Sequence, residues 1–155
     1  MPPGRSLFAA VVAAAALLVG GCAGTEPRDC RAPVGDRTLT PAVVAAGDNH
    51  QGKAITWGGT LVSARNLADA TDLEVLSYPL DECGRPLLDA PAQGRFIVRR
   101  PGYLETADLA PGRRITASGR IIATLDGRIG DADYRFPVLE DAAPRVWPER
   151  VRADA

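Results

Sequence analysis

From Lys53 onward, the chain runs in short stretches of alternating apolar and polar residues, separated by glycines and prolines. This pattern is typical of strands that each bury one face in an antiparallel sheet. Strands are expected at residues 53–62, 72–80, 94–99, 113–125 and 134–139. A sheet of such short strands exposes unpaired edges unless it closes on itself. The sequence therefore predicts an all-β fold, a small antiparallel closed barrel of OB-like type, with a β-sandwich as the alternative.

Glycines and prolines add detail to this prediction. Gly58–Gly59 and Gly119 interrupt alternating runs and predict bulges or sharp coiling. Asp126–Gly127 is a two-residue hairpin signal, and Pro137 favours a sheet edge or strand end. Before the strands, Thr40–Pro41, the run AVVAA and Gly47 are the cap signals of a short N-terminal helix.

The alternation also predicts which side chains form the core. Ile55, Trp57 and Leu61 share one face of the first strand, so Trp57 is expected inside the fold. Its expected neighbours recur at core-facing positions of the other strands: Val75, Phe96, Val98, Ile115, Ile121 and Phe136. Tyr78 is also expected in the core, whereas Trp147 is expected only to seal one end.

The amino terminus carries an export signal. Arg5 precedes an apolar run, Leu7–Val19, that is shorter than the roughly 20 residues of a membrane-spanning helix. The run ends in Gly20–Gly21–Cys22, which resembles a bacterial lipobox. That resemblance implies cleavage before Cys22 and acylation of this residue by several chains such as palmitate, which together anchor a protein stably. Ala23, in place of an aspartate, favours the outer membrane, with the protein facing the periplasm.

These signals divide the chain into four parts. Residues 1–21 are expected to be the lipoprotein signal peptide, 22–39 a flexible lipidated tether rich in glycine and proline, 40–150 the β-barrel domain and 151–155 a polar tail. Export implies an oxidising compartment, so Cys30 and Cys83, the two cysteines left after lipidation, are expected to form a disulfide, with two unpaired thiols too far apart to bond as the alternative. A redox role has no CxxC motif to support it.

Composition excludes several functions. With 18 basic and 19 acidic side chains, the chain lacks the basic excess of nucleic-acid-binding proteins. His50 is the single histidine, which excludes multi-histidine metal sites. No cofactor or metal site is expected, and His50, Glu74 and Asp81 would count as catalytic candidates only if a cleft buried them together. Acidic pairs occur at residues 81–82, 131/133 and 140–141. They fall on expected turns, where acidic side chains are common because water solvates them, so they are not taken as catalytic pairs.

Two arginine doublets are the remaining binding candidates. Arg99, Arg100, Arg113 and Arg114 could contact anionic headgroups or lipopolysaccharide phosphates, because a guanidinium matches phosphate geometry. The alternative is that they are solvated surface charges. Trp147 and Tyr103 lie nearer loops and could form a small ligand surface, with packing as the alternative.

Several motifs resemble those of one family in both content and order. The run Ile55–Val62 contains Trp-Gly-Gly, Thr71–Asp81 reads TDLEVLSYPLD, and Gly84-Arg85-Pro86 follows it. The remaining motifs are Gly94–Phe96, Gly102–Leu104, Pro111–Arg113, Tyr134–Pro137 and Val146–Trp147. Together they resemble the Slp family of starvation-inducible outer-membrane lipoproteins across residues 47–148. The resemblance implies lipid attachment, outer-membrane location and a link to starvation or stationary phase, and it transfers no catalytic residue.

The favoured function is a non-enzymatic interaction or binding module of the envelope, with a membrane contact through its lipid and an envelope protein or lipopolysaccharide as candidate partner. Two alternatives stay open. One is a periplasmic barrel that binds an oligosaccharide or lipid, which a cavity or aromatic groove including Trp57 would support. The other is a cell-wall-acting enzyme, which needs convergent polar groups in a pocket.

Overall fold

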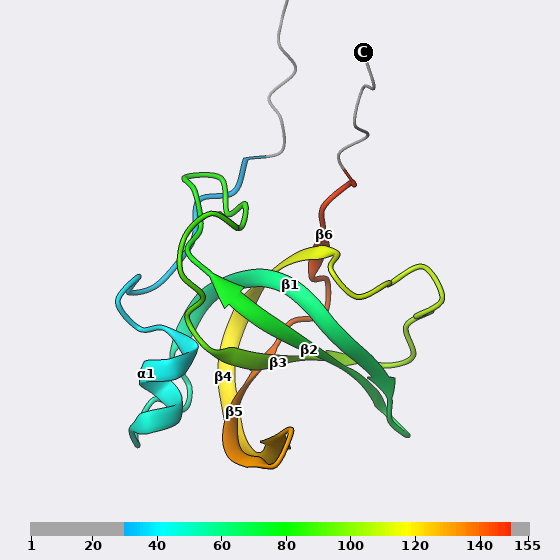
Figure 1. Ribbon diagram of the computed structural model, residues 1–155. Coiled ribbons are helices and arrows are strands. Elements are labelled where there is room, and N and C mark those ends of the chain that lie inside the picture. The colour runs from blue at the N-terminus through cyan, green and yellow to red at the C-terminus, as the bar shows by residue number, and fades with distance from the viewer. Residues whose placement is uncertain (1–29, 150–155) are drawn as a thin grey trace, which may run out of the picture.

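The computed structural model describes residues 30–149, shown in Figure 1. They form one short helix and six strands. The elements are α1 (Pro41–Ala46), β1 (Ala54–Asn66), β2 (Ala70–Tyr78), β3 (Arg95–Pro101), β4 (Arg114–Ile129), β5 (Ala132–Glu140) and β6 (Arg145–Val146). The prediction of a mostly β fold with a short N-terminal helix is confirmed.

Five of the strands are paired in a ring, in the order β1–β2–β3–β5–β4 and back to β1. Every pairing in the ring is antiparallel except the one between β3 and β5, which is parallel and joins only residues 97–99 to 138–140. The expectation of a purely antiparallel sheet is therefore wrong at this one contact. The short β6 adds to β4 outside the ring.

The predicted core faces inward as expected. Trp57 is 4% exposed and its ring meets Phe96 edge-on, with centroids 5.3 Å apart. Its indole N–H donates to the Leu39 carbonyl over 2.8 Å. Six other expected core residues lie with Trp57 in one buried cluster: Ile55, Leu61, Val75, Val98, Ile115 and Ile121. Phe136 is buried but lies outside that cluster, so its assignment to the core around Trp57 was wrong. Tyr78 is only half-buried, so its assignment to the core was wrong.

Helix α1 follows its sequence signals. Thr40 caps its first turn by accepting the Val43 N–H, and Pro41 occupies the first position. Val44 is buried in the main core cluster, while α1 packs on β3 and β5. The helix therefore lies beside the two strands whose pairing is the shortest in the ring.

The glycines inside strands mark close approaches rather than bulges. A Cβ on Gly59 or on Gly119 would overlap the Leu76 or the Glu140 carbonyl, respectively. The register shifts lie elsewhere, between Leu61 and Ser63 and between Ile121 and Ala123. The alternative expectation for these glycines, sharp coiling of the strands, is compatible with the close contacts at Gly59 and Gly119.

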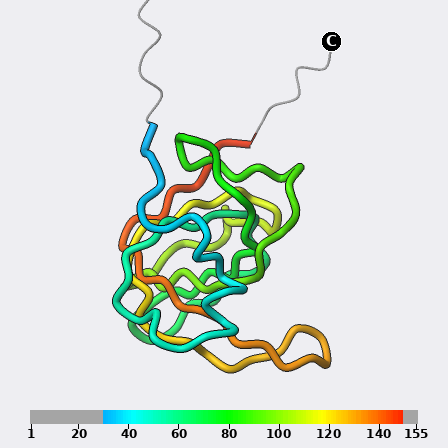
Figure 2. The backbone as a smooth tube through the Cα atoms, turned by 90° about the vertical axis from the view of Figure 1, so that its left-hand side faces the viewer, coloured from blue at the N-terminus to red at the C-terminus, as the bar shows by residue number. Residues whose placement is uncertain are grey.

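The last hairpin turns later than expected. Asp126 and Gly127 are strand residues that pair with Arg135 and Tyr134, and the turn lies at Gly130–Asp131. Gly127 is needed for a different reason, because a Cβ there would come within 2.8 Å of the Phe136 ring. The delayed turn makes the β4–β5 hairpin a long arm that Figure 2 shows projecting at the lower right.

Candidate functional site

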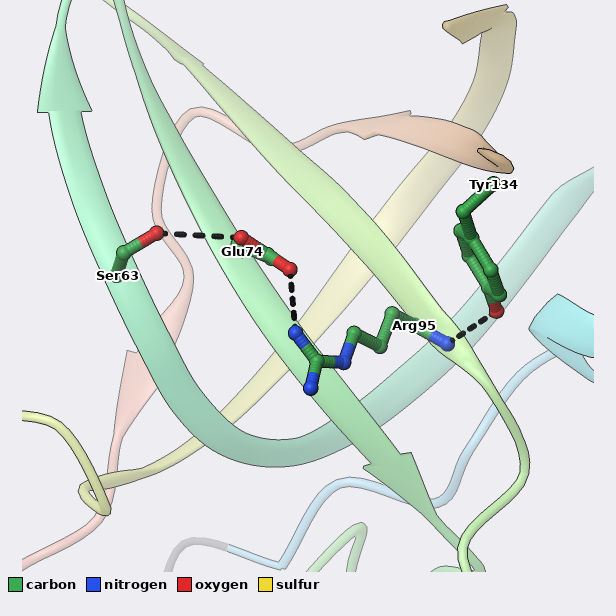
Figure 3. Close-up of polar contacts among 4 residues, drawn as sticks. All are labelled: Ser63, Glu74, Arg95 and Tyr134. Atoms are coloured by element: carbon green, nitrogen blue, oxygen red, sulfur yellow. Dashed lines mark hydrogen bonds and ion pairs between the residues drawn. The ribbon is translucent and has the colours of Figure 1, made fainter. Parts of the chain in front are cut away.

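The outward face of β1, β2 and β3 carries a row of charged side chains. Glu74 on β2 lies between the core residues Leu73 and Val75 along the strand, so the period-2 alternation directs it outward. It pairs with Arg95 on β3 over 2.9 Å and accepts a hydrogen bond from the Ser63 hydroxyl over 3.3 Å. Figure 3 shows this chain of contacts, which continues where the Arg95 backbone N–H donates to the Tyr134 hydroxyl over 2.8 Å. Four strands are thus tied together on one face.

A second ion pair lies further along the same face. Arg99 donates two hydrogen bonds of 2.8 Å to the two carboxylate oxygens of Asp72. The Asp72 side chain is only 6% exposed. These hydrogen bonds, with the attraction of the Asp72 charge, raise the pKa of Arg99 above its ordinary value. The guanidinium of Arg99 therefore stays charged and is held against Asp72.

The row of charges forms the floor of an open depression of about 380 Å³. The β4–β5 arm provides one wall, through residues 125–128 and Phe136. Phe136 is buried but does not belong to the main core cluster; its ring lies 4.8 Å from that of Tyr134. Arg65 and Arg128 contribute cations, and Asp126 an anion with 93% of its side chain exposed. The depression thus combines apolar patches with polar groups in fixed positions.

The sequence did not predict this site as a unit. Its charged residues come from strands whose register only the structure supplies, such as Asp72 opposite Arg99 and Ser63 opposite Glu74. The alternation of Asp72 and Glu74 with buried residues was a signal that these carboxylates share one outward face. The sequence did not predict the wall formed by the β4–β5 arm, because the Asp126–Gly127 pair predicted a turn at residues that belong to strand β4.

The four arginines named from the sequence do not form one cluster of free cations. Arg99 is held by Asp72, and Arg100 donates to the Tyr103 carbonyl over 2.9 Å. Arg113 donates to the Asp108 and Trp147 carbonyls, and Arg114 lies at the start of β4. One doublet lies on β3 and the other at the entry to β4, and these two strands do not pair with each other in the ring.

The catalytic candidates are scattered. Glu74 lies in the depression, and His50 lies beside α1 in a separate hollow with Val44. Asp81 caps a turn by accepting the backbone N–H groups of Cys83 and Arg85, each over 2.9 Å. Within residues 30–149, no group of three or more His, Cys, Asp or Glu side chains could hold a metal ion.

The aromatic candidates are also separated. Trp147 is 5% exposed, donates to the Thr116 hydroxyl over 2.9 Å and lies under the guanidinium groups of Arg85 and Arg145. Tyr103 is 69% exposed and bonds to Glu105. Trp57 borders a small cavity of about 90 Å³, too small for an oligosaccharide or lipid chain.

Cys30 and Cys83 are joined by a disulfide, with their Cα atoms 4.5 Å apart. Cys22 and the signal peptide lie outside the described residues. No helix within residues 30–149 has the length and apolar character to cross a membrane.

Comparisons with known proteins identify one family model and several relatives. The model of the outer membrane lipoprotein Slp family matches residues 19–155. The uncharacterized lipoprotein YeaY of Escherichia coli is 31% identical over 134 residues, covering 85% of this chain and 68% of the relative. Outer membrane protein Slp of Escherichia coli is 28% identical over 98 residues, covering 63% of this chain. An uncharacterized protein of Haemophilus influenzae is 36% identical over 96 residues, covering 61% of this chain.

The chain spans about half the length of the last two relatives, 52% in each case. No solved structure matches it. The family model, in contrast, covers more than four-fifths of the chain, including the whole of the ring and the β4–β5 arm. The protein belongs to the outer membrane lipoprotein Slp family.

Proposed function

We propose that this protein is a non-enzymatic binding module, anchored through acylated Cys22 at the periplasmic face of the outer membrane. Its five-strand ring is an OB-like closed barrel, and the depression over β1–β3 is its binding surface. Family membership supports the outer-membrane anchor. The ring order and the parallel contact between β3 and β5 support the OB-like barrel.

The depression is the observation that carries the proposal. Its floor offers hydrogen-bonding groups that are held in place by the Asp72–Arg99 and Glu74–Arg95 pairs. Such a preformed polar surface lowers the conformational cost of binding. Its wall adds apolar area from Leu125 and Phe136, so an extended ligand would meet both kinds of contact.

The same pairs argue for binding rather than catalysis. A general base must present its carboxylate to the substrate, and a guanidinium paired with that carboxylate competes for the same position. Both oxygens of Asp72 accept from Arg99, and Glu74 accepts from Arg95 and Ser63. His50 lies in another hollow, so it assists neither carboxylate.

If the protein is a ligand-binding barrel, its ligand must bind on the outer surface and not inside the ring. The interior is filled by the core cluster, and the cavity beside Trp57 holds only about 90 Å³. An oligosaccharide or an envelope protein would therefore bind in the depression. A link to starvation is part of the proposal, and comparing protein levels in growing and stationary cells tests it.

Photo-crosslinking in intact cells tests the binding surface. Benzoylphenylalanine replaces Arg65 or Arg128, which line the depression, and Ala107, an exposed residue of the β3–β4 loop, as control. A shared adduct from positions 65 and 128 that is absent at 107 is expected. A second substitution in the depression, Asp126→Arg, should reduce the yield of this adduct. The control substitution Asp108→Arg, outside the depression, should leave the yield unchanged. Equal adducts at all three positions, or none, would refute the assignment.

Fractionation tests the anchor. The unaltered protein should appear in the outer membrane with an acylated Cys22 peptide, and Cys22→Ser should leave that fraction. Unmodified, soluble periplasmic protein from the unaltered gene would overturn this part of the proposal.

A further inference from the structure

The chain enters its folded domain at a cross-linked end. Cys30 is the first described residue, and its disulfide to Cys83 fixes it to the loop between β2 and β3. In Figures 1 and 2, this loop, the blue start of the described chain and the red C-terminal end lie together at the top. The β4–β5 arm lies at the bottom of both views.

The disulfide shortens the reach of the anchor. An extended chain spans at most about 3.6 Å per residue, so the eight residues from Cys22 to Cys30 reach roughly 29 Å. Without the disulfide, the first backbone tie to the strands would be the Val34 N–H, which donates to the Thr56 hydroxyl. The twelve residues from Cys22 to Val34 would then reach roughly 43 Å. The cross-linked end thus stays within about one hydrocarbon thickness, roughly 30 Å, of the membrane surface.

Two adjacent leucines protrude from the same loop. Leu87 and Leu88 are 41% and 39% exposed. Their backbone is fixed, because the Leu87 N–H donates to the Pro79 carbonyl over 2.8 Å and Pro86 bridges to Leu80. The side chains are therefore presented outward by an ordered turn, four and five residues after Cys83.

We propose that Leu87 and Leu88 insert into the lipid interface of the membrane that holds the protein, as a second contact beside the acyl anchor. The inference rests on the anchoring at Cys22 proposed above. Glu82 and Asp89 share the loop with Arg85, so it carries no excess of positive charge. Apolar contact with the bilayer, which the short tether keeps within reach, is the basis of binding. This contact directs the β4–β5 arm and the depression away from the membrane.

Photo-crosslinking to lipid tests the orientation in the full-length protein within its own outer membrane. Benzoylphenylalanine replaces Leu88 in one variant and Leu67 in the other. Leu67 is a matched control, 38% exposed, in the β1–β2 turn rather than the cross-linked end. Mass spectrometry of each sample measures both the phospholipid adducts and the acylation of the Cys22 peptide. A severalfold excess of phospholipid adducts at position 88 over position 67 is expected.

Each other outcome counts against the proposal in a distinct way. Acylated protein without lipid adducts at 88, or with equal adducts at 67, would overturn the leucine contact and leave the anchor intact. Adducts at 88 to another protein, to a second copy or to residues 23–29 would show that something else covers the leucines. An unmodified Cys22 would overturn both the anchor and the orientation that depends on it.

Discussion

Trp57 is the residue whose replacement most directly tests the assignment of strand faces. It is 4% exposed, contacts the Phe96 ring and donates to the Leu39 carbonyl. Trp57→Ala removes the ring and leaves a cavity, which costs about 3–5 kcal/mol. Loss of the indole hydrogen bond adds about 1 kcal/mol. Since a domain has only about 5–15 kcal/mol of unfolding free energy in total, the variant should be close to unfolding.

Urea denaturation of the oxidised protein, followed by circular dichroism, measures this loss. A lowered urea midpoint is expected, and in a thermal scan the Tm should fall by roughly 15–25 °C, since 1 kcal/mol shifts Tm by roughly 4 °C at this size. Tyr103→Ala is the control, because its ring is 69% exposed, and it should stay within about 0.5 kcal/mol of the parent. A loss below about 1 kcal/mol for Trp57→Ala would show that the strand faces are wrongly assigned.

Three further changes test other parts of the structure. Peptide mapping without reduction should recover Cys30 linked to Cys83, and replacing both by alanine should destabilise the fold by up to roughly 4 kcal/mol; free alkylation of both thiols in the native protein would contradict the disulfide. Gly59→Ala should lower the unfolding free energy by about 1–3 kcal/mol, because its Cβ meets the Leu76 carbonyl; an unchanged urea midpoint would exclude that close approach. Asp72→Asn should cost about 1–3 kcal/mol by removing the charged acceptor of two Arg99 hydrogen bonds, whereas the exposed Asp133→Asn should cost less than about 1 kcal/mol; equal effects on thermal unfolding would refute the pairing of Asp72 with Arg99.

The parts of the fold that follow from local pattern were predictable from the sequence. Alternation around Trp57 identified the core face, and Thr40–Pro41 located α1. The Asp126–Gly127 pair led to a wrong turn position. An Asp-Gly pair is typical of a hairpin turn, but here the glycine lies within a strand and leaves room for the Phe136 ring. Only the three-dimensional structure distinguishes the two uses.

The candidate site depended on long-range pairing and was therefore less predictable. Asp72 and Arg99 are 27 residues apart, and nothing in their local sequence specifies that they face each other. Trp147 shows the same limit. It lies just beyond β6 and is nearly as buried as Trp57, because its backbone pairs with Arg114 and its indole N–H with Thr116.

The disulfide also determines how mechanical force enters the domain. A pull on the N-terminal segment reaches Cys30 first and passes through the covalent bond to Cys83, between β2 and β3. If the bond were reduced, the same force would act on the Val34–Thr56 hydrogen bond, then on the Leu39–Trp57 bond and the cap of α1, one after another. The oxidised protein shields these contacts from being peeled away, so reduction should lower its resistance to stretching far more than a change in unfolding free energy alone would suggest.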